Sequence, residues 1–334
     1  MPDKTPQSEI PIIDIAPLFL TDAAGIEAVD RRIAEAAFGI GFMTIVGFPA
    51  DLAVGPAERA VMLKLFELPE SERRRLCKRN FVAENSNLYR GLFPVTSSPA
   101  RTREGFEIGP DIVRSLPEDG SDDLLYEPTP LPDLSYLPSN WLDTVQAYYL
   151  AMEDIGYRIL ASLSRSLNID EAIFRDAFND GISTLRFLHY QRPAGAEEPS
   201  TAGHIDSGLL TVLAQCGVAG LQAQDMNGIW IDVPPRDDGF AINFGGLLEC
   251  WSGGRIKATR HRVINLVRDR YSVPFFFEPR PNTVISPLPI DGIARFEPFL
   301  YGDHLWDLTT KFPENLGLEN LRPPRARYTN PFAN

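Results

Sequence analysis

The stretch "GHIDSGLLTVLAQ", Gly203 to Gln215, places an imidazole and a carboxylate directly before an apolar run. His204 and Asp206 are two residues apart, and residues two apart on a β-strand point to the same face of a sheet. The run that follows them also predicts a β-strand. We therefore expect both side chains to project together from one strand of a β-rich region.

Similar short runs lie on both sides of this stretch and alternate with Gly, Asn, Asp and Pro. Seven of them follow Asp180: "STLRFLHY", "GLLTVLAQ", "GLQAQD", "GIWIDVPP", "GFAINFG", "RIKATRHRVINL" and "RYSVPFFFEP". Short strands at such spacing are typical of a sandwich, a jelly roll or a barrel. Within this region "DMNGIW" predicts a hairpin, because Asn-Gly fits a two-residue type I′ turn.

Outside the β-rich region the chain mixes helices and strands. Short strands are expected in "EIPIIDIAPL" and around 43–46. Apolar periodicity predicts helices at about 26–38, 56–66, 139–167 and 296–312, the third of them long and amphipathic. A Pro-rich, acidic loop is expected over 115–139.

The composition excludes some classes of function. The chain has 334 residues, 44% of them apolar, and a formal net charge of −13. Nucleic acids and anionic membranes are disfavoured as partners, because such binding depends on Lys and Arg neutralising phosphates. No stretch approaches the ~20 apolar residues of a membrane span. Cys77, Cys216 and Cys250 show no paired spacing, so we expect free thiols and a cytoplasmic location. The oligomeric state stays open.

Two of the four histidines of the chain can form a metal centre together with Asp206. His261, on a later predicted strand, can join His204 and Asp206. Two imidazoles and one carboxylate match the arrangement that holds non-haem Fe(II) on one triangular face, with the remaining positions open for O₂ and an oxidisable partner. A hydrolytic zinc site could use the same three ligands. His189 is adjacent to Tyr190 on a predicted strand, so the two side chains point to opposite faces, and we expect His189 in the core or behind the site. His304 is expected to be structural or exposed.

A second pair of residues favours the iron site over the hydrolytic zinc site. Arg270 and Ser272, in "RYS", are again two apart on a predicted strand. A guanidinium binds a carboxylate through two hydrogen bonds, and a hydroxyl adds one more. A carboxylate clamp close to the last metal ligand has no evident use in a hydrolytic zinc site.

These motifs resemble a known family. "GHIDSGLLTVLAQCGVAGLQAQDMNGIWIDVPP", "INFGGLLECWSGGRIKATRHRVIN" and "RYSVPFFFEP" are similar to the isopenicillin N synthase-like Fe(II)- and 2-oxoglutarate-dependent oxygenases, and "IPIIDIAPL", "GFMTIVGF" and "NLYRGLFP" resemble that family's N-terminal region. The resemblance implies a distorted double-stranded β-helix, or jelly roll: a mostly β core with flanking helices and an α/β N-terminal region. We expect an N-terminal region at 8–125 and a catalytic core at 180–285, joined into one compact unit by the helix at about 139–167.

The resemblance also implies roles for particular residues. The iron ligands would be His204, Asp206 and His261, which also makes them the catalytic set. The distal carboxylate of 2-oxoglutarate would be held by Arg270 and Ser272, with Tyr190 as a further cosubstrate contact.

The implied reaction is the oxidation, by default the hydroxylation, of a small molecule with O₂, releasing succinate and CO₂. Two alternatives stay open: an iron oxidase of the same family that does not use 2-oxoglutarate, and a non-catalytic sensor that binds metal or 2-oxoglutarate. The sequence does not name the substrate. "NLYRGLFPVTSSPARTREGFEIG" concentrates Arg90, Arg101 and Arg103 in an acidic chain, so Arg90, with Tyr89, is a candidate contact for an acidic substrate.

Overall fold

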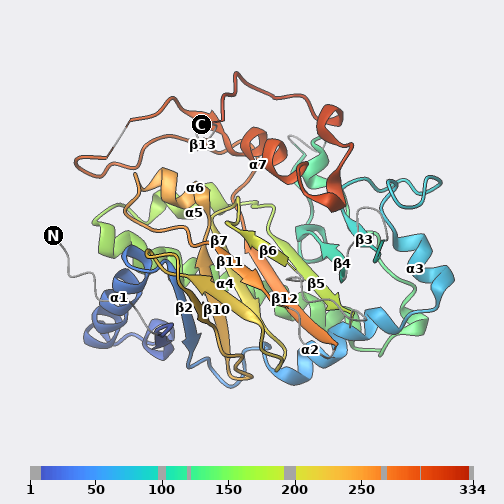
Figure 1. Ribbon diagram of the computed structural model, residues 1–334, viewed down its shortest axis with the longest axis horizontal. Coiled ribbons are helices and arrows are strands. Elements are labelled where there is room, and N and C mark those ends of the chain that lie inside the picture. Colours follow the sequence, from blue (N-terminus) through green and yellow to red (C-terminus); the bar gives the residue numbers. More distant parts are fainter. Residues whose placement is uncertain are drawn as a thin grey trace.

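The computed structural model describes residues 9–96, 103–118, 122–191, 201–264, 269–293 and 295–330. Its centre is an eight-stranded sheet in the order β1-β2-β10-β7-β12-β5-β4-β3, accompanied by a four-stranded sheet in the order β6-β11-β8-β9 (Figure 1). The strands of the large sheet are β1 Ile12–Asp14, β2 Phe42–Val46, β3 Gly91–Phe93, β4 Arg103–Ile108, β5 Thr184–Tyr190, β7 Leu210–Ala214, β10 Gly239–Phe244 and β12 Arg270–Phe277. Those of the small sheet are β6 Thr201–His204, β8 Leu221–Gln224, β9 Trp230–Asp232 and β11 His261–Val263; β13 Val284–Ile285 and β14 Phe299–Leu300 form a separate pair.

Helices flank the sheets, as Figure 1 shows. The α-helices are α1 Ala23–Phe38, α2 Pro56–Met62, α3 Glu70–Leu76, α4 Trp141–Leu167, α5 Ala172–Phe178, α6 Gly246–Trp251 and α7 Tyr301–Thr309. Short 3₁₀ turns lie at Ala16–Phe19, Leu63–Glu67, Pro110–Ile112, Leu124–Tyr126, Leu134–Tyr136, Pro313–Asn315 and Glu319–Leu321.

The long helix α4 supports the sheet from behind. At Gly156 the helix backbone comes so close to β12 that an added Cβ would lie 2.5 Å from the ring of Phe277. Only glycine allows this approach without a shift. The rings of Tyr149 and Phe275 meet edge to face with their centroids 5.0 Å apart, which continues the contact along β12. The strand that carries the predicted clamp is therefore held by a rigid helix.

The predicted fold class is confirmed. All seven runs expected after Asp180 contain strands, and the strands form a jelly-roll core with flanking helices. The helices expected at about 26–38, 56–66 and 139–167 are present, the second ending in a 3₁₀ turn. No helix in the described part of the chain is long and apolar enough to cross a membrane.

Three local predictions need correction. The strand that carries His204 ends at that residue, so Asp206 lies in the loop before β7 and not on the strand. β8 and β9 do pair as a hairpin, but five residues separate them, and Asp225 Oδ1 accepts the backbone amides of Asn227 and Ile229. This side-chain turn replaces the predicted two-residue one. The helix expected over 296–312 is confined to α7, because β14 precedes it.

Strands from both predicted regions share the large sheet. From the N-terminal region, β1 and β2 extend one edge, while β3 and β4 extend the other, where β4 pairs with β5. Such sharing supports the expectation of one compact unit. The division into 8–125 and 180–285 stays a prediction.

The C-terminal segment, residues 301–328, is fastened back to the rest of the chain. Arg322 donates through Nε and Nη2 to the two carboxylate oxygens of Asp123, at 2.7 and 2.8 Å, and through Nη1 to Asp303 at 2.8 Å. Lys78 Nζ donates to Asn315 Oδ1 at 2.9 Å. These groups are all buried. Charge-assisted hydrogen bonds of this kind fix geometry strongly, so the segment has a defined position.

Candidate metal and cosubstrate site

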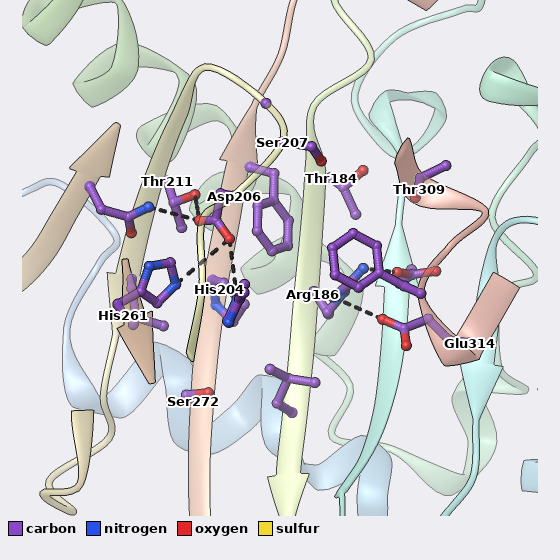
Figure 2. Close-up of a pocket in the computed structure, with 18 of the residues that line it drawn as sticks. Thr184, Arg186, His204, Asp206, Ser207, Thr211, His261, Ser272, Thr309 and Glu314 are labelled. Carbon is purple, nitrogen blue, oxygen red and sulfur yellow. Dashed lines mark hydrogen bonds and ion pairs between the residues drawn. The ribbon is translucent and has the colours of Figure 1, made fainter. Parts of the chain in front are cut away.

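Three potential metal donors meet between the two sheets. His204 is the last residue of β6 and His261 the first of β11, and the two lie directly opposite each other in the antiparallel pair. Asp206 reaches them from the loop that follows β6. Its Oδ1 lies 3.5 Å from Nε2 of His204 and 3.7 Å from Nε2 of His261. One donor atom from each residue lies within 4.8 Å of the others, and Figure 2 shows the three side chains pointing toward one another.

In both histidines the ring nitrogen that faces away from Asp206 forms a hydrogen bond to a backbone carbonyl. Nδ1 of His204 lies 2.9 Å from the carbonyl oxygen of Ala202, and Nδ1 of His261 lies 3.1 Å from that of Thr259. A carbonyl can only accept, so Nδ1 carries the proton and Nε2 keeps its lone pair for a metal.

Asp206 is oriented in the same manner. Its Oδ2 accepts from Thr211 Oγ1 at 2.6 Å and from Asn243 Nδ2 at 2.8 Å. Thr211 and Asn243 are buried neighbours on β7 and β10, paired in register. With Oδ2 occupied, Oδ1 is directed at the two imidazoles.

The protonation states of Asp206 and His261 suit metal binding. Burial alone would raise the pKa of Asp206, but the two imidazoles and the Thr211 hydroxyl hold that pKa well below its usual range. At His261 burial prevails and lowers the pKa of the imidazole, whereas at His204 the nearby Asp206 outweighs burial and raises it. The carboxylate is thus ionised and His261 neutral at pH 7, the forms in which these groups ligate metals.

The donor set fits iron better than a structural ion. Two imidazole nitrogens and one carboxylate oxygen from one side of a cavity leave the other positions open, as in non-haem Fe(II) oxygenases. A structural zinc site would use four protein ligands. Within the part of the chain that the structure describes, this is the one cluster of at least three His, Cys, Asp or Glu residues with metal-binding geometry.

The hydrogen bonds to Asp206 should matter for metal affinity. Asn243→Leu removes the Nδ2 donor and leaves Oδ2 with Thr211 alone. We expect Fe(II) affinity to fall about 10- to 100-fold, as is usual for groups that orient metal ligands. Equilibrium dialysis with Fe(II) measures this. Asn227→Leu is the control, because Asn227 Nδ2 donates to Asp225 in the exposed hairpin, away from the cavity lining. Equal losses in both variants would contradict the assignment.

Arg270 and Ser272 lie on the same cavity, both buried, on β12. Arg270 Nε donates to the carbonyl of Val218 at 3.3 Å. Within the described residues, neither Nη1 nor Nη2 of Arg270 has a hydrogen-bond partner. Burying two unpaired guanidinium donors is costly, so the two atoms indicate a missing anion with two acceptor oxygens.

Tyr190 completes this end of the cavity. It pairs in register with Arg270 across β5 and β12, and its ring centroid lies 4.8 Å from the guanidinium carbon. Burial alone would raise the pKa of Tyr190, but the positive charges of Arg270 and Arg103 bring it below its ordinary value. Tyr190 therefore adds a hydroxyl donor at the Arg270 end of the cavity.

One cavity of about 130 Å³ contains both the donor triad and the Arg270 end. It is lined by all six predicted metal and cosubstrate residues and by Tyr89.

Arg90 does not line this cavity. Its guanidinium is buried behind Tyr89, where Nη1 donates to Thr184 Oγ1 at 2.6 Å and Nη2 to the carbonyl of Ile182 at 3.2 Å. This placement speaks against the predicted contact between Arg90 and an acidic substrate. Arg101 lies outside the described residues, and Arg103 lines the cavity.

The two remaining histidines lie elsewhere. His189 bonds Glu104 through Nδ1 and Asp269 through Nε2 and stacks on Tyr271, away from the cavity. His304 is fully buried, with Nδ1 2.9 Å from the hydroxyl of Tyr328, and burial lowers its pKa to about 4. Both placements agree with the structural roles expected for them.

Several cavity residues escape prediction from the sequence. Thr211 and Asn243 follow no spacing rule relative to Asp206, although both sit on predicted strands. Arg186 and Glu314 also line the cavity, yet they are 128 residues apart, and only the tertiary fold brings them together.

Comparison with known proteins identifies relatives. The 2OG-Fe(II) oxygenase superfamily matches residues 182–279, and the N-terminal region described as that of a non-haem dioxygenase in morphine synthesis matches residues 10–156. The 2-oxoglutarate-Fe(II) type oxidoreductase hxnY of Emericella nidulans is 31% identical over 288 residues, which cover 84% of this chain and 82% of the relative. Isopenicillin N synthase of Streptomyces clavuligerus is 26% identical over 319 residues, covering 91% of this chain and 96% of the relative.

A solved structure shows the same fold. A full-length Neurospora crassa protein, crystallised in complex with alpha-KG and thymine, superposes with a TM-score of 0.77 at 21% identity, covering 92% of this chain and 99% of that one. The family models and the relative at 31% identity confirm the predicted family resemblance. The chain belongs to the 2OG-Fe(II) oxygenase superfamily and is a non-haem iron dioxygenase that uses Fe(II), O₂ and 2-oxoglutarate.

Proposed function

We propose that His204, Asp206 and His261 hold the iron, that Arg270, Ser272 and Tyr190 hold 2-oxoglutarate, and that the substrate is a small molecule. The observation that carries this proposal is the pair of unpartnered Arg270 nitrogens in the cavity that also holds the donor triad. An oxidase without 2-oxoglutarate could use such a clamp for another carboxylate. The relative at 31% identity, however, is named as a 2-oxoglutarate enzyme.

When bound, iron and 2-oxoglutarate supply O₂ activation: one oxygen atom enters succinate as CO₂ leaves, and the other oxidises the substrate. The chain's own residues bind and orient. Arg270 and Ser272 fix the distal carboxylate of the cosubstrate, and Tyr190 donates to the same end. Apolar walls, including Leu188 and Leu213, exclude water from this end of the cavity. A cytoplasmic location stays a prediction, supported by three free thiols.

The test is the stoichiometry of turnover. We expect the Fe(II)-loaded protein to convert 2-oxoglutarate into equimolar succinate and CO₂ while consuming one O₂ per turnover, with a slow rate in the absence of substrate. Succinate is quantified by chromatography and O₂ with an electrode. Uptake of O₂ without succinate would favour the oxidase, and binding of both ligands without turnover in a screen of small metabolites would favour the sensor.

A further inference from the structure

The cavity has a second half that neither the iron set nor the clamp uses. It is formed by Arg186 on β5, Phe276 at the end of β12, Glu278 just beyond it, and Phe312 and Glu314 of the C-terminal segment. In Figure 2 Arg186 and Glu314 lie across the cavity from His261 and Asp206. We call this set the distal half.

The one arginine of the distal half is already neutralised. Glu107 forms ion pairs with Lys78 and with Arg186 Nη2, and Arg186 Nη1 lies 3.4 Å from Glu314 Oε1. The guanidinium carbon also lies 4.9 Å from the ring centroid of Phe276. Two cations and two carboxylates sum to zero, so this cluster offers no surplus positive charge to an anionic substrate.

Two atoms of the distal half lack partners. Within the described residues, Oε2 of Glu314 and Nε of Arg186 are buried and form no hydrogen bond. The Glu314 side chain is only 2% exposed. Burial would raise the pKa of Glu314, but Arg186 and Arg103 hold it below its ordinary value, so the carboxylate is ionised. A buried ionised oxygen without a donor is costly and indicates a ligand that supplies one.

Glu278 adds a second carboxyl to the distal half. Among the described residues it forms no ion pair, and burial raises its pKa to about 7. The third arginine of the lining, Arg103, pairs in register with Tyr190, and its charge also acts on Glu314, whose pKa it lowers. The distal half therefore presents two carboxyl groups, those of Glu278 and Glu314, to a bound molecule.

We propose that the distal half binds a neutral or cationic substrate through N–H or O–H groups that donate to Glu314 and Glu278, with its apolar part against Phe276 and Phe312. A carboxylate at this position would face the ionised carboxylate of Glu314, which has one oxygen without a hydrogen-bond donor among the described residues. This inference rests on the proposed function, because it assigns the Arg270 end to 2-oxoglutarate. It replaces the acidic substrate expected from the sequence.

Three one-ring probes of matched shape test the proposal: benzamidine, a cationic donor; benzamide, a neutral donor; and benzoate, an anionic acceptor. Each is titrated by calorimetry into the anaerobic Fe(II) protein with saturating 2-oxoglutarate, which occupies Arg270. We expect benzamidine and benzamide to bind at least about tenfold more tightly than benzoate, the scale of one charge-assisted hydrogen bond. A wild-type protein that shows no such preference, including one that binds none of the probes, overturns the proposal.

The variants locate the effect. Glu314→Gln removes the charge and should weaken benzamidine roughly tenfold. Glu278→Gln, at a carboxyl without an ion pair, should weaken the donor probes even if Glu314→Gln does not fold. Glu84→Gln is the matched control, since Glu84 is ion-paired with Arg74 but exposed. An unchanged preference in both cavity variants overturns the proposal. The affinity for 2-oxoglutarate, measured in the same samples, should be the same in the variants as in wild type. If the wild-type protein did not bind 2-oxoglutarate, the proposed function would be refuted instead.

Discussion

Asp206→Ala is expected to abolish both iron binding and turnover. Asp206 supplies the only anionic donor of the triad and is held by Thr211 and Asn243. Removing a hydrogen-bonding neighbour of a metal ligand costs about 10- to 100-fold in affinity, so the loss of the ligand itself should exceed about 100-fold. His204→Ala and His261→Ala should behave alike, because each removes one of the three proposed metal ligands.

Equilibrium dialysis with Fe(II) and the succinate assay measure this effect, and a thermal unfolding curve of the metal-free protein checks the fold. The control is Asp238→Ala, which removes an exposed carboxylate paired with Arg236 and should change neither quantity. If Asp206→Ala kept wild-type iron affinity, the triad would not be the metal site.

Arg270→Lys should weaken 2-oxoglutarate binding roughly 10- to 150-fold while leaving iron affinity intact. Lysine keeps the charge but loses the planar fork that presents Nη1 and Nη2 together. One hydrogen bond to a charged group is worth about 1.5–3 kcal/mol, which corresponds to this range of affinity. Ser272→Ala removes one neutral donor and should cost only severalfold.

The measurement is an anaerobic titration of the Fe(II) protein with 2-oxoglutarate, followed through the visible charge-transfer band of the chelate. Arg236→Lys, at a partly exposed arginine that is paired with Asp238, is the control. Equal affinity in Arg270→Lys and wild type would show that the clamp holds something else, and an absent band in wild type with tight iron binding would favour an oxidase that places its own substrate against Arg270.

Residues close in sequence or regularly spaced were predicted well. The strands after Asp180 and the helix α4 could be predicted because apolar residues recur every two residues along a half-buried strand and every 3.6 residues along a helix. The pair Arg270 and Ser272 lies on one strand, as their spacing requires. His204 and Asp206 also meet, although through a loop: the chain turns after His204, and Thr211 and Asn243 direct the carboxylate back to the metal side.

Features that depend on tertiary contacts were not predictable. In the sequence Arg90 is one of several arginines near a candidate active-site mouth. Nothing in the neighbouring residues reveals that its guanidinium donates hydrogen bonds to Thr184 and Ile182. Glu314 lies far from every motif and lines the cavity in a C-terminal segment that Arg322 and Lys78 fasten to the rest of the chain. Long-range hydrogen bonds of this kind leave no periodic signal in a sequence.

The C-terminal segment that Arg322 fastens carries part of the proposed substrate half of the cavity. The proposed iron donors and clamp lie inside the span that matches the superfamily, and so do Arg186, Phe276 and Glu278. Phe312 and Glu314 lie beyond residue 279, where that match ends. A new substrate preference could therefore arise by exchanging the C-terminal segment, with Asp123 and Arg322 kept as its anchor, while the oxygen chemistry stays untouched. Relatives that share the reaction need not share a substrate, and transplanting residues 301–328 between them is a direct route to altered selectivity.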